Sequence, residues 1–459
     1  MTNAAHLVDS GVTAVFAVIL VAMILCLALE EKLHAKKSVI VAIFAVISLL
    51  GAAMAGLIHP ETVAILGHDV TLPVYVPGVD WEVIAIMLGS SIFVDITSKS
   101  GLFTWIAIRL TKISRGDPLI LLVYYGVMTV VFSAVLNNVT AMIIVGSLSA
   151  VSLQRLGRND NLLGFLLIEG LLTNVGGLLT LISSVPNIIV GTAAGISFVR
   201  FFTAASPYVV VATVTTIWLG ARLFAIPRLA TDEERDTARR LVAGFDERDG
   251  IESPWFFWFG AMMTVLFIAA IASVSVTPYL EDLGMGFVAL AFATIMLVRY
   301  KATADRFYQA VDWDLLAFFA GLFVVINMME HALVLALIGS ALTPIIALGE
   351  TLGGGLLLVA AALASSVTDN IPLAAMLAKI LTTMDIPSDS SFWWSVIFGA
   401  NLGGNLTPIG SASTLVAVTI MHKHGLAISF AGFVKVAVPF AILQLALAVG
   451  YVLVVLNQT

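Results

Sequence analysis

The chain has 459 residues, of which 60% are hydrophobic and 11% are charged, and its formal net charge is −7 at pH 7. Soluble domains carry about 25% charged residues, so this composition excludes an ordinary soluble protein and predicts a membrane protein. The one cysteine, Cys26, excludes a disulfide framework or a multi-thiolate metal site within the chain.

Several long apolar segments have the length that an α-helix needs to cross a bilayer, which is about 20 residues. They include 11–29, 38–58, 207–227, 254–275 and 432–456. The strand alternation of an outer-membrane barrel is missing from the sequence, so we expect helical spans. The segment 11–29 is too long for a signal-peptide core and follows no Lys or Arg, so we interpret it as the first span.

A motif recurs 232 positions along the chain. It reads Asp80-Trp-Glu and then 133–140 in the first half, and Asp312-Trp-Asp and then 365–372 in the second half. Internal repeats of this kind in a membrane chain are typical of secondary transporters, whose site lies between the two copies.

The distribution of Lys and Arg gives the two copies opposite orientations. The loops 30–38, 221–250 and 299–306 are basic, whereas 59–82 and 276–284 contain no Lys or Arg. Since basic loops stay in the cytoplasm, Asp80 enters the membrane from outside and Asp312 enters it from the cytoplasm. We therefore predict an all-α polytopic membrane protein with two inverted-topology repeats.

This orientation divides the chain into five parts. They are N-terminal transmembrane helices (1–79), the first inverted repeat (80–230), a charged cytoplasmic linker (231–250), connecting transmembrane helices (251–311) and the second inverted repeat (312–459). We expect a multi-pass protein of the plasma (inner) membrane, with loop 30–38 and linker 231–250 in the cytoplasm. Trp81, Trp313, Trp393 and Trp394 fit aromatic anchors at the membrane surfaces.

Four polar clusters interrupt apolar spans at 133–140, 173–187, 365–372 and 401–414. Polar groups inside a bilayer are costly unless they face protein or water, which makes these clusters candidates for a transport site. Two of them fit hairpin tips, and the two with Gly-Gly fit broken helices that expose backbone groups to a solute. The candidate substrate-binding residues are Ser133, Asn137, Asn138, Thr140, Asn174, Thr180, Asn187, Ser365, Asn370, Asn401, Asn405, Thr407 and Ser411.

Two carboxyl groups within apolar segments are candidates for proton coupling. Asp369 lies in a hairpin tip with no Lys or Arg near it in sequence, and its repeat partner is Asn137, which cannot titrate. A carboxyl there can carry a proton or hold a cation, or it can cap the helix that follows. Glu169 lies one to two turns before Asn174 and is the second candidate; otherwise it bonds a neighbouring helix.

These motifs resemble the ion transporter superfamily, and within it the branch of arsenite permeases and the melanosomal P protein. Sodium/proton antiporters of the NhaD type and dicarboxylate symporters are more distant relatives. The resemblance covers about 80–455 and implies a scaffold domain, a mobile transport domain, two re-entrant hairpins and elevator-type movement. Many relatives are homodimers.

Three acids of the family pattern are replaced in this chain. Asn137 stands in a Leu-Asp-Asn-Val-Thr pattern, Ser184 in Gly-Asp-Pro-Pro-Asn and Asn401 in Asp-Leu-Gly-Gly-Asn. The loss of carboxylates weakens a sodium site, and the clusters contain no Lys or Arg for a multiply charged anion. The remaining neutral groups suit a small polyhydroxylated solute, such as uncharged arsenous acid.

The sequence thus predicts proton-coupled efflux of arsenite, and of the similar antimonite, by a protein that is not an enzyme. A Na⁺/H⁺ antiporter, a Na⁺- or H⁺-coupled carboxylate symporter and a non-transporting scaffold or receptor are the alternatives. The expected partners are the small inorganic solute, protons and membrane lipid, and no nucleic acid, cofactor or bound metal is expected. A homodimer and an ATPase subunit are left open; the chain itself has no Gly-x-x-x-x-Gly-Lys-Ser/Thr loop.

Overall fold

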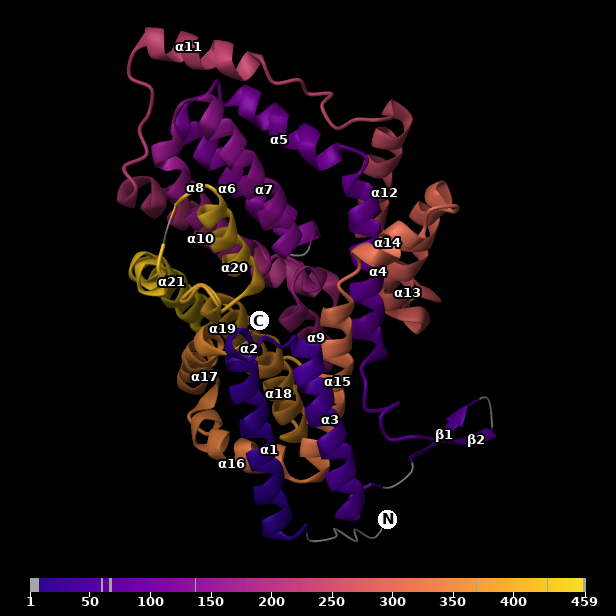
Figure 1. Cartoon of the computed structure of the whole chain (residues 1–459). Coiled ribbons are helices and arrows are strands. Elements are labelled where there is room, and N and C mark those ends of the chain that lie inside the picture. Colours follow the sequence, from indigo (N-terminus) through magenta and orange to yellow (C-terminus); the bar gives the residue numbers. More distant parts are fainter. Residues whose placement is uncertain are drawn as a thin grey trace.

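The computed structural model describes residues 8–58, 61–65, 68–136, 138–368, 370–426 and 428–456 (Figure 1). Ten helices in these ranges are long and apolar enough to cross a membrane. The prediction of an all-helical polytopic membrane protein is confirmed, with one small exception outside the spans. A two-stranded antiparallel sheet, which the sequence did not predict, forms between α3 and α4.

The N-terminal part and the first half have the following elements. They are α1 (Ser10–Ala28), α2 (Glu30–Leu33), α3 (Lys37–Met54), β1 (Glu61–Ile65), β2 (His68–Leu72), α4 (Trp81–Ser98), α5 (Leu102–Ile113), α6 (Pro118–Val135), α7 (Asn138–Arg155), η1 (Asn159–Asn161), α8 (Leu162–Gly176), η2 (Leu181–Ser183), α9 (Val185–Ala193) and α10 (Phe198–Leu223).

The linker, the connecting helices and the second half follow. Their elements are α11 (Asp232–Ala243), α12 (Pro254–Ser273), η3 (Val274–Val276), α13 (Leu280–Leu297), η4 (Val298–Tyr300), α14 (Asp305–Ala310), α15 (Trp313–His331), α16 (Val334–Ile346), α17 (Gly349–Val367), α18 (Asn370–Thr383), α19 (Ser391–Gly403), α20 (Ala412–Lys423) and α21 (Phe430–Val454).

The recurring Asp-Trp motif starts α4 and α15 in the same way. Asp80 Oδ1 accepts hydrogen bonds from backbone N–H groups of the first turn of α4, and Asp312 Oδ1 does so at α15. Carboxylates at this position stabilise a helix because the first N–H groups have no partner within the helix. The indole nitrogens of Trp81 and Trp313 both donate to a carbonyl five residues earlier, at 3.0 and 2.7 Å.

The third residue of each motif binds the helix that packs beside it. Glu82 accepts a hydrogen bond from the backbone N–H of Met285 in α13, at 3.0 Å, and Asp314 accepts one from the hydroxyl of Ser38 in α3. Accordingly, α13 packs along α4 and α3 packs along α15. The motif therefore has a structural role in both halves.

The two halves contain the same kinds of helices in the same order. Each half has a pair of helices joined by a short tip, α6–α7 and α17–α18, then a broken helix, α8–α9 and α19–α20, and then a long helix with an internal proline, Pro207 in α10 and Pro439 in α21. In Figure 1, α4 rises from the β1–β2 hairpin to α5, whereas α15 descends from α14 to α16.

The halves are not separate domains, because their helices interlock. The second-half helix α18 packs against α9 of the first half, and α20 packs against α7 and α8. This contact brings the breaks in the two broken helices together in the middle of the molecule.

One expectation about individual residues was wrong. Trp393 and Trp394 are 2% and 3% exposed, so they are core residues and not surface anchors; Trp81 and Trp313 are more than half exposed, as expected. The predicted charged linker 231–250 packs against the helices at one point, where Val242 and Phe245 are buried against Ile108 of α5. An amphipathic helix that carries apolar residues on one face buries that face wherever a neighbour offers one.

Candidate transport site

The breaks in α8–α9 and α19–α20 confirm the two predicted broken helices. α8 ends at Gly176 and the chain resumes its helix at Val185, and α19 ends at Gly403 and resumes at Ala412. Between these points the regular α-helical hydrogen bonding is interrupted, and several backbone carbonyls accept hydrogen bonds from side chains instead.

Glycine at each break lets a hairpin helix approach closely. A Cβ on Gly176 would lie 2.7 Å from the backbone of Val130 in α6, and a Cβ on Gly403 would lie 2.3 Å from the carbonyl oxygen of Ala362 in α17. Real Cβ atoms do not tolerate such contacts, so the sequence must place glycine here for the hairpins to pack.

Hydroxyl groups then fasten each hairpin to its broken helix in matching ways. Ser133 bonds the carbonyl of Thr173, and Ser365 bonds the carbonyl of Ala400, both at 2.6 Å. In the opposite direction, Thr180 donates to the carbonyl of Ala134 and Thr407 to that of Ser366, again at 2.6 Å. Four predicted site residues therefore hold the two hairpins in place.

The two halves meet through the amide of Asn174. Its nitrogen donates to Asn405 Oδ1 at 2.8 Å and to the Ser411 hydroxyl at 2.9 Å. Its oxygen accepts from the Ser413 hydroxyl at 3.2 Å and lies 3.4 Å from the amide nitrogen of Asn138. All hydrogen-bonding positions of this side chain are thus filled by neutral groups from the second broken helix and from the first hairpin.

A second amide group bridges the halves at Asn401. Its nitrogen donates to Asn187 Oδ1 at 2.8 Å, and its oxygen accepts from the Ser184 hydroxyl at 2.7 Å. The Asn187 nitrogen in turn donates to the carbonyls of Gly177 and Thr180, at 2.6 and 2.9 Å, and both carbonyls also accept from the Ser183 hydroxyl. Two of the three positions where the family pattern has acids, Ser184 and Asn401, are therefore bonded to each other here.

Sequence reasoning missed Gln444, which extends the network into α21. It is fully buried, accepts from the Asn405 nitrogen at 2.7 Å and donates to the Thr216 hydroxyl of α10 at 2.9 Å. Gln444 is a lone amide in the apolar segment 432–456, and this isolation was the signal that could have identified it. Ser413 and Thr216 are likewise buried members that the prediction omitted.

Not every predicted residue enters this network. Asn137 and Asp369, the two hairpin-tip positions, lie outside the described residues. Asn370 begins α18 and is 9% exposed, and Thr140 lies half-buried in the first turn of α7. The described network therefore joins the two breaks.

Glu169 is fully buried in α8, one turn before Thr173. One carboxylate oxygen accepts from the Ser149 hydroxyl of α7 at 2.5 Å, and the other has no hydrogen-bond partner among the described residues. A buried carboxylate that lacks partners is expensive, because it gives up hydration without a replacement. Protonation removes this cost, since a neutral carboxylic acid needs less compensation.

The centre of the molecule is otherwise uncharged in the part of the chain that the structure describes. The described ion pairs lie at the ends of helices and in the linker, such as Lys99 with Asp95 and Lys379 with Glu330. The described ranges also contain no group of three or more His, Cys, Asp and Glu side chains that could hold a metal ion.

Comparisons with known proteins agree with the resemblance seen in the motifs. A family model described as citrate transporter (CitMHS) matches residues 27–399. A 46 kDa membrane protein of Mycobacterium leprae is 31% identical over 86% of this chain and 91% of its own length. The P protein of Homo sapiens is 24% identical over 90% of this chain and 58% of its own length.

A solved structure has the same fold. The crystal structure of the YdaH transporter of Alcanivorax borkumensis, reported to have an unusual topology, gives a TM-score of 0.59 and covers 92% of this chain and 98% of its own. Its sequence identity is 14%, so this likeness concerns the fold alone.

Proposed function

We propose that this chain, which belongs to the citrate transporter family of the ion transporter superfamily, couples proton movement to the export of a small uncharged polyhydroxylated solute. Membership of the family makes the chain a secondary transporter and not an enzyme. The solute and the coupling ion are the proposed part, and the plasma membrane is the proposed location.

The observation that carries the proposal is the neutral hydrogen-bond network around Asn174 and Asn401. To enter it, a solute must replace bonds between amides and hydroxyls with bonds of its own. An uncharged molecule with several hydroxyl groups can make that exchange at little net cost, because each neutral hydrogen bond contributes only about 0.5–1.5 kcal/mol net. Arsenous acid, or the similar antimonous acid, has this chemistry.

The amide ends of α9 and α20 favour the same kind of solute. Both helices begin at the breaks, with Ser184 and Ser411 as their N-cap residues. Helix N-termini offer N–H donors and a partial positive charge to a polar oxygen. This suits an oxygen-rich neutral molecule without requiring Lys or Arg.

Glu169 and Asp369 are the proposed proton carriers. Glu169 has one buried oxygen without a partner among the described residues and lies within two turns of Asn174, so its protonation would alter the field around the network. Asp369 is proposed from its position in the hairpin-tip motif.

We propose that the halves are inverted repeats that work as an elevator. The matching hydrogen bonds of Ser133 and Ser365, and the opposite directions of α4 and α15 in Figure 1, support this relationship. A homodimer and a cytoplasmic position for 30–38 and 231–250 belong to the same proposal.

A carboxylate substrate is the second candidate, and the family model favours it. Among the described residues of the network no cation stands ready for such an anion, so a carboxylate would need charge compensation from a bound cation or from the helix ends. Transport assays can separate the two candidates directly.

Proteoliposomes with an imposed pH gradient provide the test. We expect arsenite to accumulate, and the accumulation to collapse when the gradient is dissipated. Glu169→Gln and Asp369→Asn should each abolish the accumulation. The control variant Asp160→Asn, at an exposed surface position, should not. Gradient-driven citrate uptake without arsenite uptake would establish the second candidate. Sodium-dependent proton release, with no transport of arsenite or citrate, would overturn both candidate functions.

A further inference from the structure

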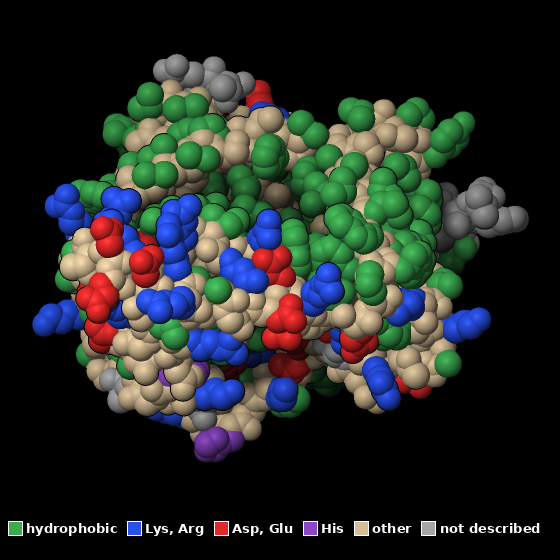
Figure 2. Space-filling view, turned by 90° about the horizontal axis from the view of Figure 1, so that it is seen from above, with side chains coloured by type: hydrophobic (Ala, Val, Ile, Leu, Met, Phe, Trp, Pro, Cys, Tyr) green, Lys and Arg blue, Asp and Glu red, His purple; other side chains and the backbone are tan. Residues whose placement is uncertain are grey.

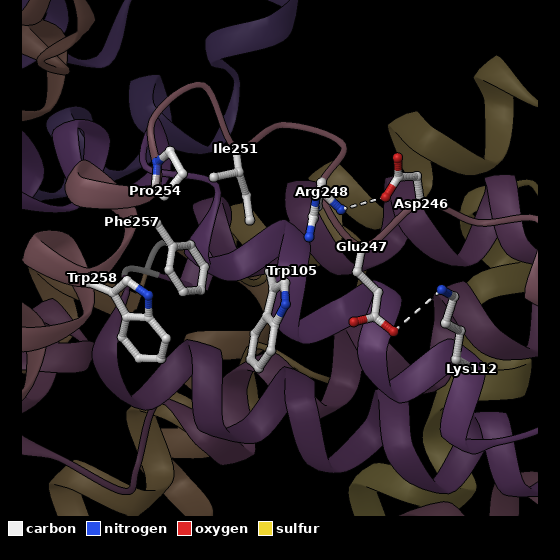
Figure 3. Close-up of a pocket in the computed structure, with 9 residues that line it drawn as sticks. All are labelled: Trp105, Lys112, Asp246, Glu247, Arg248, Ile251, Pro254, Phe257 and Trp258. Carbon is white, nitrogen blue, oxygen red and sulfur yellow. Dashed lines mark hydrogen bonds and ion pairs between the residues drawn. The ribbon is translucent and has the colours of Figure 1, made fainter.

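A cavity of about 690 Å³ lies far from the polar centre in the fold, where α5, the segment after α11 and the start of α12 meet (Figure 3). Its volume falls within the range of about 300–1,000 Å³ that small-molecule sites occupy. The proposed transport function makes no use of it.

One side of the cavity is aromatic. The ring of Trp105 in α5 lies 5.6 Å from that of Phe257 in α12, edge to face, and Phe257 lies 5.3 Å from Trp258. Trp258 is 70% exposed although it belongs to a helix long and apolar enough to span a membrane. This wall is therefore open toward the space that lipid chains occupy around a span.

The other side of the cavity carries charge, but its acids are already occupied. Glu247 bonds Arg109 through both oxygens, at 3.0 and 3.1 Å, and Lys112 lies 3.3 Å from it. The Arg109 guanidinium beside Glu247 holds the pKa of that carboxyl below its usual range, so it stays ionised. Asp246 accepts a bond from the backbone N–H of Arg248 at 2.9 Å.

The remaining charge is the guanidinium of Arg248. No carboxylate of the described chain pairs with it, and its side chain points into the cavity above Trp105 (Figure 3). With Arg109 and Lys112 it gives the rim three cations against two engaged acids. The rim therefore has an excess of positive charge and favours an anionic ligand. Arg binds phosphate well because pairs of its N–H groups match pairs of phosphate oxygens.

The surroundings of the cavity have the residue types of a membrane boundary. Figure 2 looks onto the end of the molecule that carries α11 and α5, and shows charged side chains gathered beside broad hydrophobic surfaces. At the start of α12, Trp255 is 63% exposed, and the guanidinium of Arg299 lies 4.4 Å from the ring of Phe256. Exposed Trp with Arg is typical of the boundary between headgroups and hydrocarbon.

We propose that this cavity binds one anionic glycerophospholipid. Its phosphate would pair with Arg248 beside Lys112, and the upper part of an acyl chain would lie along Trp105, Phe257 and Trp258. A soluble anion would leave the aromatic wall without a partner, and an apolar compound would leave Arg248 without one. Basic pockets at the cytoplasmic ends of spans are known to bind acidic headgroups.

Such a lipid would fill the space between α5 and α12 and contact both helices. It would therefore stabilise the packing of these two helices at the cytoplasmic end of the protein. Binding at this site is independent of which solute the transporter carries.

Quenching of tryptophan fluorescence by brominated lipid tests the proposal on the purified, delipidated full chain. We expect brominated phosphatidylglycerol to quench saturably, near one lipid per protein, and Trp105→Phe to reduce the amplitude. Arg248→Gln should weaken the affinity roughly tenfold or more, as expected from loss of a hydrogen bond to a charged group. The matched control is Arg240→Gln, at an exposed arginine of α11 outside the cavity, which should bind as the unmodified protein does.

Three results would overturn the proposal. Equal quenching by brominated phosphatidylcholine, or unchanged affinity in Arg248→Gln, would mean ordinary lipid around the spans. Protection of the chain against heat by glycerol 3-phosphate, with no saturable lipid quenching, would assign the rim to a soluble phosphate.

Discussion

The amide nitrogen of Asn174 donates a hydrogen bond to the side-chain oxygen of Asn405, 231 positions later in the chain, at 2.8 Å. This bond joins the break in α8–α9 to the break in α19–α20. In the proposed transport cycle, a solute would meet polar groups from both halves at this contact.

Asn174→Ala should therefore affect both stability and transport. The change leaves Asn405 Oδ1 without its donor and removes one of the bonds of the Ser411 hydroxyl, and a buried polar group left unpaired costs about 1–3 kcal/mol. We expect a lower melting temperature in detergent and a loss of most transport in proteoliposomes.

Ser340→Ala is the control for this change, because that hydroxyl is exposed and bonds only within its own helix, α16. If Asn174→Ala transports normally, the network is a structural contact between helices and not part of the solute pathway.

The glycines at the two breaks make a second prediction about stability. Gly176→Ala places a Cβ 2.7 Å from the backbone of α6, and Gly403→Ala places one 2.3 Å from that of α17. Overpacking of a core costs about 1–3 kcal/mol, so both variants should melt at lower temperature. In Gly450→Ala, the new Cβ in α21 meets no atom within 4 Å apart from the backbone of its own helix, so this variant should not melt at lower temperature. Equal melting of all three would show that the hairpins can shift away from the breaks.

Glu169→Gln should separate coupling from folding. The amide keeps the size of the side chain and can still accept the bond from Ser149, so the melting temperature should change little. Since an amide cannot carry a proton, solute movement should no longer follow an imposed pH gradient. Solute exchange at equal pH on both sides should persist at a measurable rate. Persistence of gradient-driven accumulation in this variant would leave Asp369 as the remaining carrier.

The linker contact makes a prediction about pH. The pKa of Glu247 lies below its usual range because Arg109 and Lys112 bond it, so the contact stabilises the docked linker above the ordinary pKa of glutamate, about 4.3. The contribution is lost only as the pH falls through the lowered pKa of the folded state. The protection of the backbone amides of 231–250 against hydrogen exchange, relative to the rate of an unstructured chain at the same pH, should stay constant from pH 7 to about pH 5. This protection should fall in more acidic buffer. Glu247→Gln should speed exchange at pH 7, and a transition between pH 5 and 7 would contradict the assignment.

The sequence predicted the breaks and the hairpins because their signals are local. Gly-Gly within an apolar span, and polar residues flanked by spans, can be recognised without knowledge of the neighbours, and the helix ends at Gly176 and Gly403 agree with them. The recurrence of Asp-Trp was also visible, but its role as a helix start tied to α13 or α3 depends on contacts from distant parts of the chain.

The misses concern features that depend on the packing partner. The sequence cannot show which helix covers Trp393 and Trp394, and both turn out to be buried. The burial of Phe245 in the charged linker could not be predicted because its partner, Ile108, lies far away in sequence. Gln444 was not predicted because one amide hardly changes the hydropathy of a long apolar segment. In the structure its side chain bonds Asn405 through its oxygen and Thr216 through its nitrogen.

The paired hydroxyl bonds lead to the last prediction, which tests whether the halves are equivalent. Thr180→Val and Thr407→Val each remove one bond, to Ala134 in the first hairpin and to Ser366 in the second. Valine keeps the shape but lacks the hydroxyl, so each variant leaves one carbonyl unpaired and should lose about 1–3 kcal/mol.

Both halves use the same bond in the same geometry, so the two losses should be equal in sign and similar in size when chemical unfolding is followed in detergent. Thr215→Val in α10, whose hydroxyl bonds only its own helix, is the control. A large loss in one half with no loss in the other would show that only that hairpin is held against its broken helix. The matching distances would then reflect shared ancestry of sequence without a shared role in the transport cycle.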